Sequence, residues 1–270
     1  AKWVLVLDEK DKDKIVNLAK EVGFPLFAKP DCGMGSQNTF KLNNIDDIDA
    51  FFNKKSECVY IIEEFIDGHI VSYDGITNSK GDVIFSDSHF FNSQISQVVE
   101  GELDDFYYCL PSVPNDLEEI GRKVVKSFNV QNRFFHIEFF RTNKESRFGP
   151  KETLVALEAN MRCPGGYTPD LINYANSVSC YNIYADSCAF DLTFENMDYE
   201  KYFAICVCRR YKFEYAYSYE SVFEKYNSYI TMSGEYPPVF RDDLGDYYFI
   251  ARFKTLEEAM EFERFVRLKK

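Results

Sequence analysis

Residues 155–162 read Val-Ala-Leu-Glu-Ala-Asn-Met-Arg, and from Leu157 onward apolar and polar side chains alternate. This alternation predicts a β-strand, because successive side chains of a strand point to opposite faces of the sheet. Glu158, Asn160 and Arg162 therefore share one face. A carboxylate on an apolar strand costs free energy unless a partner or ligand compensates it. The planar fork of Arg162 suits a carboxylate or a phosphoryl group that is being transferred.

A second stretch of this kind, Phe-His-Ile-Glu-Phe at residues 135–139, places His136 and Glu138 on one face and apolar side chains on the other. If the two strands are neighbours, the carboxylates of Glu138 and Glu158 converge with the amide oxygen of Asn160. Mg²⁺ (or Mn²⁺) favours such oxygen ligands, together with phosphate oxygens and water. We predict a metal site formed by Glu138, Glu158 and Asn160; the alternative is a structural salt-bridge cluster.

Closer to the N-terminus, residues 24–30 (Phe-Pro-Leu-Phe-Ala-Lys-Pro) form a predicted buried strand that ends near Lys29. An ammonium group in this position is expensive unless an anion compensates it. Gly33, Gly35 and Ser36 follow, and glycines allow the backbone to direct N–H groups at phosphate oxygens. The spacing is not that of the G-x-x-x-x-G-K-[ST] loop. We predict a phosphate-binding loop; the alternative is a strand-end lysine followed by a β-turn.

Residues 61–68, Ile-Ile-Glu-Glu-Phe-Ile-Asp-Gly, join a predicted strand to a turn. One interpretation is a solvated acidic edge. The other is a hinge between two lobes, where backbone groups and a carboxylate face an adenine between apolar walls. Adenine needs an acceptor for its exocyclic amine and a backbone N–H for a ring nitrogen.

The order FPLFAKP…GMGS, IIEEFIDG, FHIEF and LEANMRCPGG resembles the ATP-grasp superfamily. It is most similar to the carboxylate–amine ligase branch, and more distantly to biotin carboxylase and carbamoyl phosphate synthetase. The resemblance covers roughly residues 1–190 in the family's order, and is therefore more specific than any single motif.

The resemblance implies a role for each candidate residue. It implies that Lys29 contacts the α- and β-phosphates of ATP and assists phosphoryl transfer, while Arg162 steadies an acyl phosphate. The other implied contacts are a mobile phosphate loop of Gly33, Gly35 and Ser36, an adenine site of Glu63, Glu64 and Ile66, and a metal site of Glu138, Glu158 and Asn160.

The sequence departs from the family pattern in three places. Ile70 stands where a glutamate usually contacts the ribose, and Asn38 replaces a glycine that commonly follows the phosphate loop. The family usually begins with a Rossmann-like substrate lobe, whereas this chain starts almost directly on the predicted strand 3–7. We therefore expect the chain to be a fragment from which that N-terminal lobe is absent.

The predicted fold class is α+β, with two α/β lobes that clasp ATP and a small C-terminal α/β subdomain. We place the phosphate-loop lobe at residues 1–67, the metal-site lobe at 68–198 and the C-terminal subdomain at 199–270. Within the second lobe, residues 170–190 are predicted as one helix. In the third, strand and helix alternate twice between residues 202 and 268.

Composition narrows the function classes. The net charge of −13 argues against a nucleic-acid partner, since phosphate backbones need a basic surface. No run of ~18 apolar residues occurs, which predicts no membrane span. The eight cysteines lack the paired short spacings of zinc sites, the closest being Cys206 and Cys208. Cys58, Cys109, Cys163 and Cys188 are predicted as small buried thiols. A reducing cytoplasm is the expected compartment.

The predicted function is an ADP-forming ligase that joins a small-molecule carboxylate to an amine through an acyl phosphate, with ATP and Mg²⁺ (or Mn²⁺) as cofactors and a homodimer as a possible assembly. Two alternatives stay open. One is another ATP-grasp enzyme, such as a carboxylase or a kinase acting on a hydroxyl. The other is a non-catalytic ATP-binding regulatory module.

Overall fold

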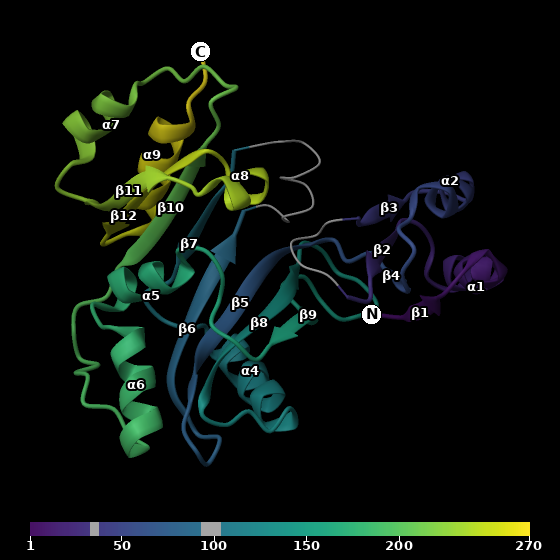
Figure 1. Cartoon of the computed structure of the whole chain (residues 1–270), viewed down its shortest axis with the longest axis horizontal. Helices are drawn as coiled ribbons and strands as arrows, with labels where there is room; N and C mark the ends of the chain where they lie inside the picture. Colours follow the sequence, from purple (N-terminus) through teal and green to yellow (C-terminus); the bar gives the residue numbers. More distant parts are fainter. Residues whose placement is uncertain (33–37, 93–103) are drawn as a thin grey trace.

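The computed structural model describes residues 1–32, 38–92 and 104–270, which fold into a small and a large lobe (Figure 1). The small lobe has an antiparallel sheet in the order β1-β4-β2-β3. Its elements are β1 (Trp3–Val6), η1 (Glu9–Asp11), α1 (Lys12–Val22), β2 (Leu26–Pro30), β3 (Phe40–Leu42), α2 (Asp46–Lys54) and β4 (Tyr60–Glu64).

The two helices of the small lobe cover one face of its sheet. In α1, Ile15 and Leu18 are buried at helical spacing, and the helix ends at Gly23, whose φ of 82° suits glycine. These side chains pack with Leu26 and Ala28 of β2 in the lobe's core. The next residue of β2, Lys29, belongs to the opposite face of the sheet, which lies away from the helices (Figure 1).

The large lobe is built on an eight-stranded antiparallel sheet in the order β11-β12-β10-β7-β6-β5-β8-β9. Its elements are β5 (Gly68–Thr77), β6 (Val83–Phe91), β7 (Phe106–Cys109), α4 (Asn115–Ser127), β8 (Arg133–Thr142), β9 (Leu154–Asn160), α5 (Thr168–Asn176), α6 (Cys180–Phe190), β10 (Phe203–Arg209), α7 (Tyr219–Tyr226), β11 (Ile230–Glu235), α8 (Pro238–Leu244), β12 (Tyr247–Phe253) and α9 (Leu256–Arg267).

Helices cover both faces of this sheet. On one face, α4 approaches β5 so closely that a Cβ at Gly121 would lie 2.1 Å from the Tyr73 ring. Farther along the same face, α7 and α9 pack on β10 and β12. On the other face, Leu171 of α5 packs beside Cys109, and Ile183 of α6 packs beside Ile76. This second face also carries the candidate site, at its β8–β9 end (Figure 1).

Several predicted elements differ in the structure. The single helix expected at residues 170–190 is two helices, because Ser177 ends α5 in a left-handed conformation with φ 55°. Strands β7 and β11 and helix α8 were not predicted. Residues 199–270 supply β10, β11 and β12, which extend the sheet of residues 68–198 because β10 pairs with β7. The boundaries at 67/68 and 198/199 as domain limits remain predictions.

In the part of the chain that the structure describes, no helix is both long and apolar enough to cross a lipid bilayer.

Candidate functional site

The two acidic strands identified in the sequence are neighbours in the sheet. β8 and β9 pair so that Glu138 lies opposite Glu158, and His136 lies opposite Asn160. Side chains directly opposite each other on one face have Cβ atoms about 4.5–5.5 Å apart. The Asn160 amide nitrogen donates to Glu158 Oε1 at 2.9 Å, which orders both side chains. The pairing of the two strands, on which the predicted convergence depends, is confirmed.

This arrangement fits a hard divalent cation. Glu138 and Glu158 present carboxylate oxygens, Asn160 adds an amide oxygen, and Mg²⁺ prefers ligands of this type. Glu158 is exposed, whereas the Glu138 side chain is only 15% exposed. The pair therefore lies at the edge between protein and solvent, where a cation and phosphate oxygens have access. Metal binding by these residues remains a prediction.

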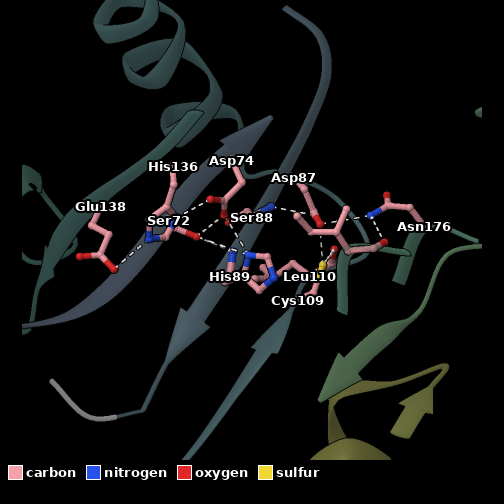
Figure 2. A network of polar contacts seen from close by, with 11 residues as sticks. Ser72, Asp74, Asp87, Ser88, His89, Cys109, Leu110, His136, Glu138 and Asn176 are labelled. Carbon is pink, nitrogen blue, oxygen red and sulfur yellow. Dashed lines mark hydrogen bonds and ion pairs between the residues drawn. The ribbon is translucent and has the colours of Figure 1, made fainter. Parts of the chain in front are cut away.

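Glu138 lies at one end of a buried polar network that the sequence analysis missed (Figure 2). His136 Nε2 lies 3.3 Å from Glu138 Oε1, and His136 Nδ1 lies 2.5 Å from Asp74 Oδ1. Asp74 is fully buried on β5 and also accepts hydrogen bonds from Ser72 Oγ and from His89 Nδ1, the latter at 2.9 Å. One carboxylate of the interior therefore orients the histidine that orients Glu138.

The charges in this network stabilise each other. Burial alone would lower the pKa of His136, but Asp74 and then Glu138 raise that pKa to about 10. Burial alone would raise the pKa of Asp74, but the charge of His136 and the hydrogen bonds from His136 and His89 hold it below its usual value. At neutral pH an imidazolium therefore bridges two carboxylates, donating a proton to each. His136 therefore acts as a hydrogen-bonded support for Glu138.

Asp74 could have been found by the argument that identified Glu138. Residues 70–78 (Ile-Val-Ser-Tyr-Asp-Gly-Ile-Thr-Asn) contain an aspartate in the middle of a predicted buried strand, where an unpaired carboxylate is costly. The signal is weaker, because which partner compensates the charge depends on the pairing of β5 with β8 and β6.

Arg162 lies two residues beyond the end of β9, so strand alternation does not extend to it. Its side chain is exposed and donates to the backbone carbonyl of Cys163 at 3.0 Å. Its predicted contact with an acyl phosphate stays a prediction.

On the small lobe, Lys29 Nζ forms an ion pair with Glu63 Oε1 at 2.5 Å. Both side chains are partly buried, with 27% and 21% exposed, and they project from the face of the sheet that is not covered by helices. The anion that compensates Lys29 in this structure is thus Glu63, another predicted nucleotide contact.

The predicted phosphate loop of Gly33, Gly35 and Ser36 lies outside the described residues. Asn38, just after it, has φ 57°, in the left-handed region. Asparagine adopts this region with less strain than most residues. The replacement of a family glycine at this position is therefore compatible with the backbone.

The predicted hinge connects β4 to β5. Glu64 Oε1 and Oε2 accept from Arg147 Nε at 2.8 and 3.0 Å, and these hydrogen bonds lower the pKa of Glu64. Ile66 is buried, with 6% exposed. At Gly68 the chain passes so close to β8 that a Cβ would lie 2.7 Å from the Arg141 carbonyl oxygen. The Arg147 contact, which sequence reasoning missed, ties a loop of the large lobe to the small one.

Comparison with known proteins places this geometry in a fold. No protein-family model and no curated protein sequence matches the chain. Among solved structures, an N5-carboxyaminoimidazole synthetase from Staphylococcus aureus complexed with ADP superposes with a TM-score of 0.69 at 14% identity, over 96% of this chain and 64% of that one. An L-amino acid ligase from Bacillus licheniformis gives a TM-score of 0.68 at 12% identity, over 97% and 66%.

A third structure, the ADP complex of PurK, an N5-carboxyaminoimidazole ribonucleotide synthetase, has a TM-score of 0.65 at 15% identity, over 98% of this chain and 65% of that one. The chain thus has the ATP-grasp fold, as the motifs predicted. It spans about two thirds of the length of the structures that it resembles.

Proposed function

We propose that this chain is the nucleotide-binding part of an ATP-dependent carboxylate–amine ligase that forms an acyl phosphate and releases ADP. The observation that carries the proposal is the β8–β9 register, which sets Glu138 beside Glu158 while the His136–Asp74 pair anchors Glu138 from the interior. An ATP-grasp fold that retains an acidic pair with such support is better suited to Mg·ATP chemistry than to passive nucleotide binding.

Each residue has a distinct task in this proposal. Glu138, Glu158 and Asn160 would hold Mg²⁺ (or Mn²⁺), which when bound neutralises charge on phosphate oxygens. Glu64 and Ile66 would line the adenine through backbone groups. Lys29 would bind the phosphates, and because it is paired with Glu63 in this structure, nucleotide binding must divide or replace that pair.

The proposed reaction has two balanced steps. An oxygen of the substrate carboxylate attacks the γ-phosphorus, the bond to the β-phosphate oxygen breaks, and ADP leaves with that electron pair. An amine nitrogen then attacks the acyl carbon, the carbon–oxygen bond to phosphate breaks, and the amine proton passes to solvent. Lys29 and Arg162 would stabilise the transferring phosphoryl group, so the chain's contribution is positioning and charge neutralisation.

The comparisons bear on the type of reaction in two ways. The similar structures include an L-amino acid ligase and synthetases solved with ADP. They also include carboxyaminoimidazole synthetases, which favour the alternative of a carboxylase-type reaction. Bicarbonate therefore belongs among the substrates tested.

The first test is nucleotide binding. Calorimetry should show Mg-dependent ATP binding, and Lys29→Ala should weaken it about 10- to 150-fold, because a charge-assisted hydrogen bond contributes ~1.5–3 kcal/mol. Lys20→Ala, which removes an exposed lysine from α1, is the matched control and should leave the affinity unchanged. Equal affinities of Lys29→Ala and wild type would remove Lys29 from the site.

The second test is turnover. ADP release would be screened across carboxylic acids paired with amines, with bicarbonate and with hydroxyl acceptors, and the products identified by mass. Glu158→Gln and Asn160→Ala should lose ADP formation, whereas Glu119→Gln, an exposed carboxylate on α4, should not. AMP as the nucleotide product would refute the acyl-phosphate route. ATP binding without ADP release from any pair would favour the regulatory module.

A further inference from the structure

Three side chains with metal-binding atoms meet in the interior, on the same sheet face as the candidate active site but deeper in the lobe. Asp87 and His89 lie on β6, and Cys109 lies directly opposite His89 on β7. The exposed fractions are 2% for Asp87 and 0% for the other two. A carboxylate oxygen, a ring nitrogen and the thiol sulfur all lie within 4.8 Å of one another.

His89 is oriented as a metal-ligating histidine would be. Its Nδ1 lies 2.9 Å from Asp74 Oδ2, and because a carboxylate only accepts, the ring proton sits on Nδ1. Nε2 then carries a lone pair. Among the described residues Nε2 has no hydrogen-bond partner, although it is buried. The ring lies between Asp74 on one side and Cys109 on the other (Figure 2). A buried acceptor without a partner is unfavourable, so a ligand there would be stabilising.

The other two groups are also held in place. Asp87 accepts from the Asn176 amide at 3.2 Å and from the backbone N–H of Ser88 at 2.8 Å. The Cys109 thiol donates to Asp87 Oδ2 at 2.8 Å. Burial raises the pKa of Asp87 to about 6 and raises the pKa of Cys109 well above its usual value. Without a cation, the low-dielectric interior thus favours the protonated thiol.

We propose that Asp87, His89 and Cys109 form a buried site for a divalent transition metal of the Zn²⁺ class, separate from the Mg²⁺ site at Glu138 and Glu158. The ligands are a carboxylate oxygen, Nε2 and the thiolate sulfur, with water as a fourth. Binding forms the metal–sulfur bond and releases the thiol proton. A carboxylate and a thiolate then balance the two positive charges, while the imidazole stays neutral.

The ligand types select the metal. Thiolate and imidazole favour Zn²⁺ and Co²⁺, whereas Mg²⁺ prefers oxygen ligands. The Asp74–His89 contact is the carboxylate–histidine–metal arrangement that fixes the tautomer and strengthens the imidazole as a ligand. Asn176 supports Asp87 in the same way. The competing occupant is a buried water molecule that bridges His89 Nε2 and its neighbours.

Cobalt distinguishes these occupants. The purified chain would be stripped with chelator, dialysed and titrated with Co²⁺ in the absence of nucleotide. We expect one equivalent to bind with a thiolate-to-cobalt charge-transfer absorption, which Zn²⁺ abolishes and excess Mg²⁺ does not. Cys109→Ala should lose the absorption. Cys180→Ala, which removes a buried thiol outside the cluster, should keep it.

Two outcomes would overturn the proposal. The first is that Co²⁺ binds the wild-type chain without a thiolate band. The ion would then be held by oxygen ligands such as Glu138 and Glu158, and water would be the occupant of the buried cluster. A band that persists in folded Cys109→Ala comes from other thiols. Folding of each variant would be checked by circular dichroism. If Cys109→Ala does not fold, the wild-type spectrum still tests the proposal, because the wild-type chain must show the band. Nucleotide is absent, so the result is independent of the proposed ligase activity.

Discussion

Replacing Asp74 with asparagine tests whether one interior carboxylate supports the candidate site. Asp74 is fully buried, accepts from Ser72, and lies 2.5 Å from His136 Nδ1 and 2.9 Å from His89 Nδ1. Asparagine has nearly the same shape but no charge. In the wild type, Asp74 is the main cause that raises the pKa of His136 to about 10. The substitution therefore removes the main anionic partner of His136.

The expected loss of stability is large for a substitution that conserves volume. Removing one partner of a buried ion pair typically costs ~3–5 kcal/mol, because the remaining charge stays in a low-dielectric interior. Part of the cost is recovered if His136 loses its proton, and Glu138 keeps the other ring nitrogen engaged at 3.3 Å. We therefore expect a decrease in the free energy of unfolding of about 3 kcal/mol.

The assay is equilibrium urea denaturation at pH 7 with chelator and without nucleotide, so that no ligand contributes. Asp67→Asn is the matched control. Its carboxylate is 45% exposed and pairs with Lys144 at 2.8 Å, and such exposed pairs contribute at most ~1 kcal/mol. If Asp74→Asn and Asp67→Asn lower stability equally, the interior network does not stabilise the protein as argued.

Three further outcomes follow from the packing and the titration of single residues. Gly121→Ala should lower the urea midpoint by the equivalent of ~1–3 kcal/mol, although alanine is the better helix former, because its Cβ would lie 2.1 Å from the Tyr73 ring; an unchanged or higher midpoint contradicts this. Arg147→Ala should cost under ~1 kcal/mol in thermal unfolding, since its side chain is 44% exposed, and a larger loss would mean that its contact with Glu64 contributes more to stability than an exposed ion pair does. Burial raises the pKa of Cys163 from 9.0 to about 11, so its alkylation rate followed by mass spectrometry should rise up to that pH, and a plateau near 9 would show an ordinary thiol.

The candidate metal site was predictable because a strand has a period of two residues. The alternation in 135–139 and 157–160 determines which side chains share a face, whatever lies around them. The pairing of β8 with β9 was a conditional expectation, and the register Glu138↔Glu158 confirmed it. Helix α1 was predictable for a similar reason, since Ile15 and Leu18 recur at helical spacing and Gly23 follows.

Short or irregular elements were not predictable in the same way. β7 (Phe106–Cys109) has four residues, and its place inside the sheet depends on pairing with the preceding strand β6 and with β10, which is far away in the sequence. Residues 176–179 (Asn-Ser-Val-Ser) divide the segment 170–190, and Ser179, the N-cap of α6, is the local signal of this break that the prediction of one helix missed. The sequence predicted a separate subdomain for the segment that contains β10, β11 and β12. These strands instead extend one continuous sheet, and no local pattern indicates that pairing.

What the sequence by itself determined is which chemical groups occur and on which face of each strand they lie, because strand and helix periods are properties of neighbouring residues. Glu138, Glu158 and Asn160 follow from that rule. The tertiary structure alone decided which strands meet, and hence that Asp74 supports His136 and that Cys109 faces His89. Cross-strand partners lie up to 62 residues apart in this network, and their pairing is set by the packing of the whole sheet between its helices, which no local pattern encodes.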